Sequence, residues 1–251
     1  MMPLRTPWSR YFHIGFFPSP ELEVLRIPGA PAFMRGVKAL FLSDIHLRGC
    51  VSDEKLHALI RQIRAAGADL ILLGGDYAET DAQCARFFEA FRGVDAPLGV
   101  YGVPGNNDDR ESLPAYMARA GAILLSNRAV SLHLPGGKLQ IGGCDDHKFG
   151  SPRTSGLFSD GGYRILISHF PAAPDCAPDL MLSGHTHGGQ INFLGLTPYS
   201  IGFERAYRLL GAGGLSKFGN SYLAVCNGIG VSRLPLRIGA RAQILLVEFG
   251  S

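Results

Sequence analysis

Residues 37–46 read VKALFLSDIH, a mostly apolar run that ends abruptly in polar residues, and this pattern decides the fold. The run Val37–Leu42 predicts a strand, and Leu70–Leu73 predicts the next one. Between them, Ser52 is placed to cap a helix. Four apolar residues recur along one face of that helix, at Leu56, Leu59, Ile60 and Ile63. A strand, a helix and a second strand in this order predict neighbouring parallel strands in a buried sheet.

The alternation of strands and helices continues to residue 122 and then changes. Asp81–Arg92 and Ser112–Ala120 predict two further helices, and Gly99–Val103 predicts a strand between them. After residue 122 the apolar runs predict strands with few helices, at Ile123–Leu125, Val130–Leu134, Leu139–Ile141, Arg164–Ile167, Leu180–Leu182, Tyr222–Val225 and Gln243–Phe249. Two stacked mixed sheets flanked by helices satisfy both halves of the chain, so the predicted class is α+β.

The composition indicates one domain with a full core. Of 251 residues, 46% are hydrophobic and 18% are charged. A net charge of +3 is too mild to indicate a nucleic-acid partner. The five cysteines are scattered without a CxxC pair, which favours a reducing compartment. No apolar run reaches about 18 residues and no secretory signal is visible, so we expect a cytoplasmic protein without a membrane-spanning helix.

Two segments differ from the rest of the chain. Residues 1–35 are aromatic, basic and rich in proline (WSRYFHIGFFPSP), and we treat them as an extension to a domain at 36–251. Residues 193–215 (FLGLTPYSIGFERAYRLLGAGGL) are apolar and suit a lid, with Arg205 and Arg208 as basic residues. Both segments either pack against the domain or, if exposed, favour a lipid-linked phosphate ester. The aromatic and basic N-terminus also suits weak peripheral attachment to the inner membrane face.

Polar residues follow five of the predicted strands. They are Asp44 and His46, Asp76, Asn106 with Asn107 and Asp108, His169, and finally His185 and His187. One such residue alone has an ordinary explanation, such as a helix cap or a polar turn. Because ligands bind at the carboxyl ends of strands in open α/β sheets, five strand ends together predict one shared site. A buried group of imidazoles and carboxylates needs cations to offset desolvation and mutual repulsion, so we expect metal.

The types of ligand narrow the choice of metal. Imidazole, carboxylate and amide oxygen without thiolate suit manganese, iron, zinc, cobalt or nickel, whereas magnesium and calcium prefer oxygen alone. The seven candidate ligands are Asp44, His46, Asp76, Asn106, His169, His185 and His187. Seven ligands are too many for one ion with an open position. They fit two ions that share a bridging carboxylate, an arrangement that serves displacement at phosphorus.

The motifs DIH (44–46), GGD (74–76), GNN (105–107), His169 and GHTHGGQ (184–190) resemble the calcineurin-like metallophosphoesterases, from residue 37 to the C-terminus. The last motif is similar to a bacterial branch that includes phosphodiesterases and membrane-anchored members. The resemblance implies a four-layer α/β/β/α sandwich and a hydroxide held between two ions that attacks phosphorus. By position it assigns Asp44, His46 and His187 to one ion, Asn106, His169 and His185 to the other, and Asp76 to both.

One position departs from the family pattern. The family usually reads GNHD, and this chain has Asn107 where the histidine stands. Asparagine donates a hydrogen bond but cannot transfer a proton at neutral pH, so we expect good leaving groups to be favoured. Asp108 would normally orient the missing histidine. His147 is a candidate replacement acid, with a histidine on a surface loop as the alternative.

The sequence therefore predicts a phosphoesterase with two divalent transition-metal ions, manganese first, acting on a phosphodiester or a diphosphate linkage. A lipid-linked and a nucleotide-linked substrate are both open. Asp76, Asn106, Asn107 and His185 are the predicted catalytic residues. The alternative is a scaffold of this fold, weakened in catalysis, that binds a protein partner. Loss of metal ligands would favour the scaffold, and here all seven positions are present.

Overall fold

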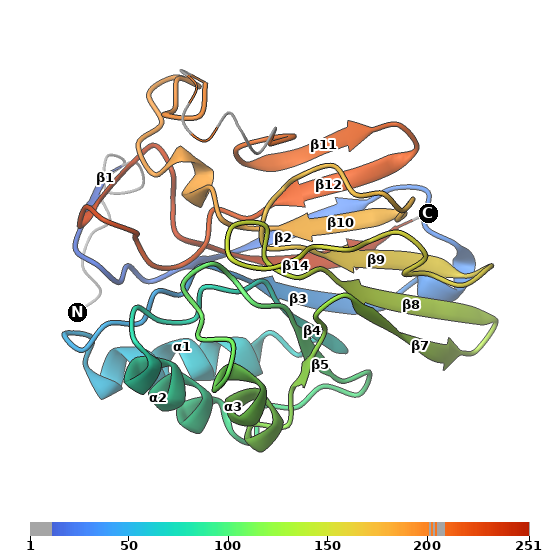
Figure 1. Ribbon diagram of the computed structural model, residues 1–251, viewed down its shortest axis with the longest axis horizontal. Coiled ribbons are helices and arrows are strands. Elements are labelled where there is room, and N and C mark those ends of the chain that lie inside the picture. Colours follow the sequence, from blue (N-terminus) through green and yellow to red (C-terminus); the bar gives the residue numbers. More distant parts are fainter. Residues whose placement is uncertain (1–11, 201, 203, 205–208, 251) are drawn as a thin grey trace.

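The computed structural model describes residues 12–200, 202, 204 and 209–250 (Figure 1). Three α-helices lie early in the described chain: α1 (Asp53–Ala65), α2 (Asp81–Phe91) and α3 (Leu113–Arg119). The side chain of Ser52 accepts a hydrogen bond from the backbone N of Lys55 (3.4 Å), as its predicted capping role requires. Two short 3-10 turns lie at Ala32–Met34 and His187–Gly189.

The first sheet contains six strands in the order β2 (Glu21–Ile27), β14 (Gln243–Phe249), β3 (Lys38–Leu42), β4 (Leu70–Leu73), β5 (Val100–Gly102) and β6 (Ile123–Leu124). Strands β3 to β6 run parallel to one another, and β14 is antiparallel to β3. The predicted strand–helix alternation is confirmed here, because α1 and α2 connect these parallel strands.

The second sheet also has six strands, in the order β11 (Gly214–Phe218), β12 (Ser221–Val225), β10 (Leu180–Ser183), β9 (Tyr163–Ile167), β8 (Gly137–Gly143) and β7 (Arg128–Leu134). Strands β8, β9, β10 and β12 are parallel, and antiparallel strands lie at both edges. The prediction of two mixed sheets is therefore confirmed.

Alternate residues of the central strands build two cores. In β3, Leu40 and Leu42 pack with the apolar faces of the helices, whereas Ala39 and Phe41 pack with residues of the second sheet. This alternation follows from the two-residue repeat of a strand. The helices thus cover one face of the first sheet, and the second sheet covers the other face (Figure 1).

The outer face of the second sheet is covered by loops in the described part of the chain. Leu166, Met181 and Leu223 face this side and are packed by Leu157 and Phe158 of the loop before β9. All three described α-helices belong to the first sheet, so the predicted helical layer here is replaced by loop residues. The connections 144–162 and 170–179 are rich in proline, glycine and aspartate, which favour turns over helices.

The predicted extension at 1–35 lies partly outside the described residues, which begin at residue 12. Its described part contributes strands to the structure. β1 (Phe12–Ile14) pairs with β13 (Leu236–Ile238), and β2 forms the edge of the first sheet beside β14. Among the described residues, no helix has the length and apolar character needed to cross a bilayer.

Candidate metal centre

Polar side chains from five strand ends meet at one end of the sandwich. They are Asp44 and His46 after β3, Asp76 after β4, Asn106 after β5, His169 after β9, and His185 and His187 after β10. The carboxylates and imidazoles of this set expose 8% of their surface or less. Asn106 is half-buried. The parallel strands of both sheets place these groups at their carboxyl ends, on the same end of the sandwich (Figure 1).

The backbone of these residues is unusual. Asp44, His46, Asp76, His185 and His187 have φ angles between 44° and 69°, in the left-handed region. Residues other than glycine rarely adopt this conformation, which costs about 1–3 kcal/mol at each position. Strain of this kind persists only where the surrounding structure fixes it, and it gathers at functional sites. The backbone is therefore an indication of function that does not depend on the side-chain types.

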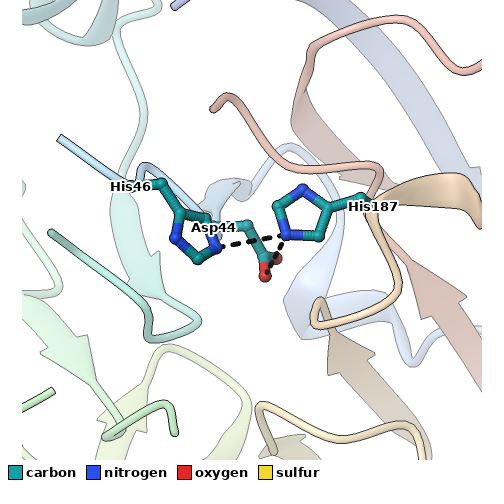
Figure 2. Close-up of side chains that lie close together, drawn as sticks. All are labelled: Asp44, His46 and His187. Atoms are coloured by element: carbon teal, nitrogen blue, oxygen red, sulfur yellow. Dashed lines mark hydrogen bonds and ion pairs between the residues drawn. The ribbon is translucent and has the colours of Figure 1, made fainter. Parts of the chain in front are cut away.

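The first histidine pair, His46 and His187, lies beside Asp44. Figure 2 shows the three side chains turned toward one another. The Nε2 atoms of the two rings are 3.1 Å apart, and Asp44 Oδ1 lies 3.6 Å from His187 Nε2. The three residues offer ligand atoms that all lie within 4.8 Å of one another. Such a group can hold one divalent ion.

The second histidine pair, His169 and His185, lies across the site. His185 Nδ1 is 3.3 Å from His169 Nε2. A second group of ligand atoms within 4.8 Å of one another comprises Asp44, Asp76 and His169. Asp76 Oδ2 lies 3.4 Å from His46 Nε2 and 3.5 Å from His169 Nε2. One carboxylate oxygen therefore faces a histidine of each pair, which is the position of a bridging ligand.

The electrostatics of this site favour bound cations. Burial lowers the pKa of His169, but the charges of Asp76 and Asp44, with hydrogen bonds to Asp76 and to the backbone of Gly74, together outweigh burial and raise that pKa to about 10. The pKa of His46 is also raised, because hydrogen bonding to Glu79 and the charges of Asp76 and Asp44 outweigh burial. The buried carboxylates thus favour positive charge at His46 and His169, and divalent ions satisfy the same demand.

The packing around the carboxylates fits the demands of a metal centre. A Cβ added at Gly184 would lie 2.2 Å from Asp44 Oδ2, and one added at Gly105 would lie 2.2 Å from Asp76 Oδ1. Only glycine allows these loops to approach the carboxylates so closely. The Oδ1 atom of Asn106 is buried and has no hydrogen-bond partner. A buried amide oxygen without a donor is a suitable metal ligand.

Each histidine has a second partner at its outer nitrogen, and three of these partners were not predicted. Glu79 Oε1 lies 2.6 Å from His46 Nδ1, and Arg237 Nη2 lies 3.2 Å from His187 Nδ1. Glu204 is hydrogen-bonded to His185 Nε2. His169 instead donates from Nδ1 to the backbone oxygen of Gly74 (2.8 Å). An oxygen that accepts the outer N–H fixes the orientation of a metal-binding ring, and Glu79, Glu204 and the backbone of Gly74 offer such oxygens.

The sequence alone gives little indication that Glu79 and Arg237 contact the histidines. Glu79 lies three residues after Asp76, on the loop that follows the same strand. Arg237 is an arginine with an exposed fraction of 2%, and it also donates to backbone oxygens of Asn227, Gly228 and Gly230. Neither contact can be inferred before the loops are placed in space.

Asp108 and Asn107 hold the loop after β5 against the loop after β4. The carboxylate of Asp108 accepts hydrogen bonds from the backbone N atoms of Asp76 (2.8 Å), Tyr77 (2.9 Å) and Gly105 (2.8 Å). Burial and the charge of Asp76 raise the pKa of Asp108 to about 7. The backbone N of Asn107 donates to Asp76 Oδ1 (2.8 Å). Asp108 therefore orients backbone atoms around Asp76.

His147 contacts an aromatic ring that lies beside the second histidine pair. Its ring centroid is 5.5 Å from that of Phe170, which stacks on His185 at 3.6 Å. Burial lowers the pKa of His147, and its Nδ1 has no hydrogen-bond partner. The neighbouring Asp146 accepts from the backbone N of Lys148 and Phe149 and so shapes the turn.

A cavity of about 890 Å³ adjoins the centre. Much of its wall comes from the described part of residues 192–214, and Gly188, Asn227, Gly239 and Ala240 complete it. Glu204, the partner of His185, belongs to the same wall. The predicted lid residues Arg205 and Arg208 lie outside the described residues. The segment between β10 and β11 thus connects the second histidine pair to the cavity.

Comparison with known proteins agrees with this geometry. The family of calcineurin-like phosphoesterases matches residues 37–189. An uncharacterized protein of Bacillus subtilis, YpbG, is 31% identical over 82% of this chain and 78% of its own length. The uncharacterized metallophosphoesterase YkuE of the same organism is 31% identical over 86% of this chain and 80% of its own length. Phosphodiesterase YaeI of Escherichia coli is 27% identical over 84% and 81% of the two chains.

Proposed function

The chain belongs to the calcineurin-like phosphoesterase family, and we propose that it is a phosphodiesterase that works with two divalent transition-metal ions. The observation that carries this proposal is the position of Asp76, with one oxygen within 3.5 Å of a histidine from each pair. Two ions with a shared carboxylate suit displacement at phosphorus. Similarity to phosphodiesterase YaeI supports a diester as the substrate.

We assign the ligands as follows. Asp44, His46 and His187 hold the first ion; Asn106, His169 and His185 hold the second; Asp76 joins both. Manganese is our first choice, with iron, zinc, cobalt and nickel as alternatives that accept the same mixed ligands. When bound, such ions polarise the phosphoryl oxygens and lower the pKa of water. The buried carboxylates and the unpartnered Oδ1 of Asn106 support this assignment.

Asn107 sets the preference for the leaving group. Its side chain is exposed, and its Nδ2 lies 3.3 Å from His46 Nδ1. Its backbone is bound to Asp76 Oδ1. From this place it donates a hydrogen bond to a phosphoryl or leaving oxygen but supplies no proton. We therefore propose that the enzyme prefers leaving groups of low pKa, such as an aryl oxide, a nucleotide or a phosphate.

Asp76, Asn106, Asn107 and His185 are the residues that we place nearest the reacting atoms. His147 is the remaining candidate for a proton donor, and it contacts Phe170, the ring that stacks on His185. For location, we propose the cytoplasm, with peripheral attachment at the inner membrane face. The five cysteines are all unpaired, which supports a reducing compartment.

The direct test is hydrolysis of bis(p-nitrophenyl) phosphate by the full chain. Chelated protein should be inactive and should recover with manganese. Asp76→Asn should stay inactive after reloading, whereas Asp95→Asn, an exposed aspartate away from the strand ends, should behave as the wild type. Turnover by the chelated protein, or by Asp76→Asn at the wild-type rate, would rule out the proposed function. A folded, metal-loaded protein without turnover on any diester would favour the scaffold.

A further inference from the structure

Half of the large apolar side chains that are exposed in the described chain gather in three segments. They are Phe12 (51% exposed), Ile14 (70%), Phe193 (67%), Leu194 (92%), Leu196 (65%) and Leu234 (54%). We call this set the apolar corner. Scattered exposed apolar residues need no explanation, but a group of this kind marks an interaction surface.

Hydrogen bonds join the three segments side by side. In the pair of β1 and β13, Phe12 lies opposite Ile238, and Gly15 N donates to Pro235 O (2.8 Å). On the other side of β13, Asn192 N donates to Ile238 O (2.7 Å). The hairpin at 193–196 follows directly and is closed by hydrogen bonds between Phe193 and Leu196. The apolar corner is therefore one continuous structural unit, at the upper left of Figure 1.

The segments that form the corner contain two arginines, Arg233 and the buried Arg237, and no lysine. Residues 12–20, 188–200 and 228–240 contain no aspartate or glutamate. Arg233 is exposed and directly precedes Leu234. A surface with apolar side chains on a protruding turn and a basic residue at its edge complements a bilayer with anionic headgroups. A protein interface would instead be expected to place polar residues around a flatter apolar centre.

The corner is also continuous with the cavity beside the metal centre. Gly195 of the hairpin, Thr197 and Gly239 line that cavity together with Gly188, the neighbour of His187. We propose that the apolar corner docks on an anionic lipid bilayer, so that a phosphoester at the membrane surface enters the cavity beside the metal centre. The entry of a phosphoester into the cavity rests on the proposed function, whereas the docking itself does not require catalysis.

The test is flotation of the full chain with vesicles of phosphatidylcholine and phosphatidylglycerol. Leu194→Glu should lower the bound fraction at least about tenfold, because a charge replaces an apolar group that enters the interface. Arg233→Glu should weaken binding about fivefold on these vesicles and have little effect on pure phosphatidylcholine. Ile123→Glu is the matched control, since Ile123 is exposed (44%) on β6 and lies outside the corner.

The outcomes separate the docking from the catalysis. Failure of the wild type to float, or equal flotation of Leu194→Glu and the wild type, would overturn the proposal and leave a protein partner as the occupant. An equal loss in Ile123→Glu would also overturn it. Leu194→Glu should keep the circular dichroism, metal content and turnover of soluble bis(p-nitrophenyl) phosphate of the wild type. Wild-type protein that floats but hydrolyses nothing would contradict the proposed function alone.

Discussion

The two histidine pairs of the candidate centre are held by different parts of the molecule. The first pair, His46 and His187, is contacted by Glu79 and Arg237, and Arg237 is buried among backbone oxygens of the loop after β12. The second pair depends on one backbone oxygen at His169 and on Glu204 at His185. Glu204 comes from the segment that also lines the cavity.

Because of this difference, we expect the first pair to be rigid and the second pair to respond to a bound substrate. Glu79 belongs to the loop after β4 and Arg237 to strand β13, where it is buried, so we expect the fold to fix the geometry of the first pair. The partner of His185 belongs to a segment whose tip carries Leu194, the most exposed large apolar residue described. The proposed second ion is therefore coupled to the cavity wall through Glu204, whereas Glu79 and Arg237, the outer partners of the first pair, do not line the cavity.

The largest effect is expected where the two pairs meet. Asp76→Asn removes the charge that faces both His46 and His169, so both ions should be bound more weakly. We expect turnover of bis(p-nitrophenyl) phosphate to fall by at least about 10³-fold. Asp95→Asn, which makes the same change at an exposed aspartate outside the site, is the control. Substantial activity in Asp76→Asn would show that the pairs work without a shared carboxylate.

Removal of the His187 imidazole tests whether the two histidine pairs hold separate ions. His187→Ala takes away one of the three groups of the first cluster and leaves His169 and His185 in place. Metal content should fall toward one ion per chain, and turnover should fall by about 10²–10³-fold. Elemental analysis after desalting measures the first effect. Retention of two ions and full turnover would mean that His187 is no ligand.

Asn107→His tests the leaving-group preference beside the first pair. Protonation by an imidazole should help alkyl diesters by up to about 10²-fold and should change aryl diesters little. The comparison requires metal analysis to confirm that both ions are retained. In the wild type, the logarithm of the rate should fall steeply with leaving-group pKa. If the dependence on leaving-group pKa is shallow and His147→Ala does not steepen it, the proposed leaving-group preference is wrong.

The outer carboxylates give the sharpest comparison of the two pairs. Glu79→Gln and Glu204→Gln make the same chemical change at His46 and His185, and each should weaken one ion by about 10–100-fold. Because Glu204 also lines the cavity, its variant should change KM as well, whereas Glu79→Gln should leave KM nearly unchanged. Identical effects of the two variants on KM would remove the proposed link between the second ion and the cavity.

Much of the fold could be read from the sequence, because buried strands and amphipathic helices carry strong patterns. The predicted limits of Leu70–Leu73 and Gln243–Phe249 agree with β4 and β14. Strands β1, β2, β11 and β13 were not predicted. Of these, β2 and β11 lie at the edges of the six-stranded sheets, where ELEVLRI and GLSKF lack a run of apolar residues. Edge strands are stabilised by their neighbours, which a local pattern does not contain.

The site was predictable in its residue types but not in its support. Asp44 and His46 follow a strand in the sequence, so their meeting with His187 could be proposed from topology and resemblance. Their left-handed backbone could not, since no residue type signals it outside glycine. Arg237 reaches His187 across 50 residues of chain, and that distance is closed only by the complete fold.

The number of metal ions bound by the full chain decides whether the centre is binuclear. Protein reloaded with manganese and desalted should contain two ions per chain by elemental analysis, and Asp76→Asn should contain fewer, with Asp95→Asn unchanged. This result would support a binuclear centre built around Asp76. One ion or none in the folded wild type, after reloading with manganese, iron or zinc, would contradict it.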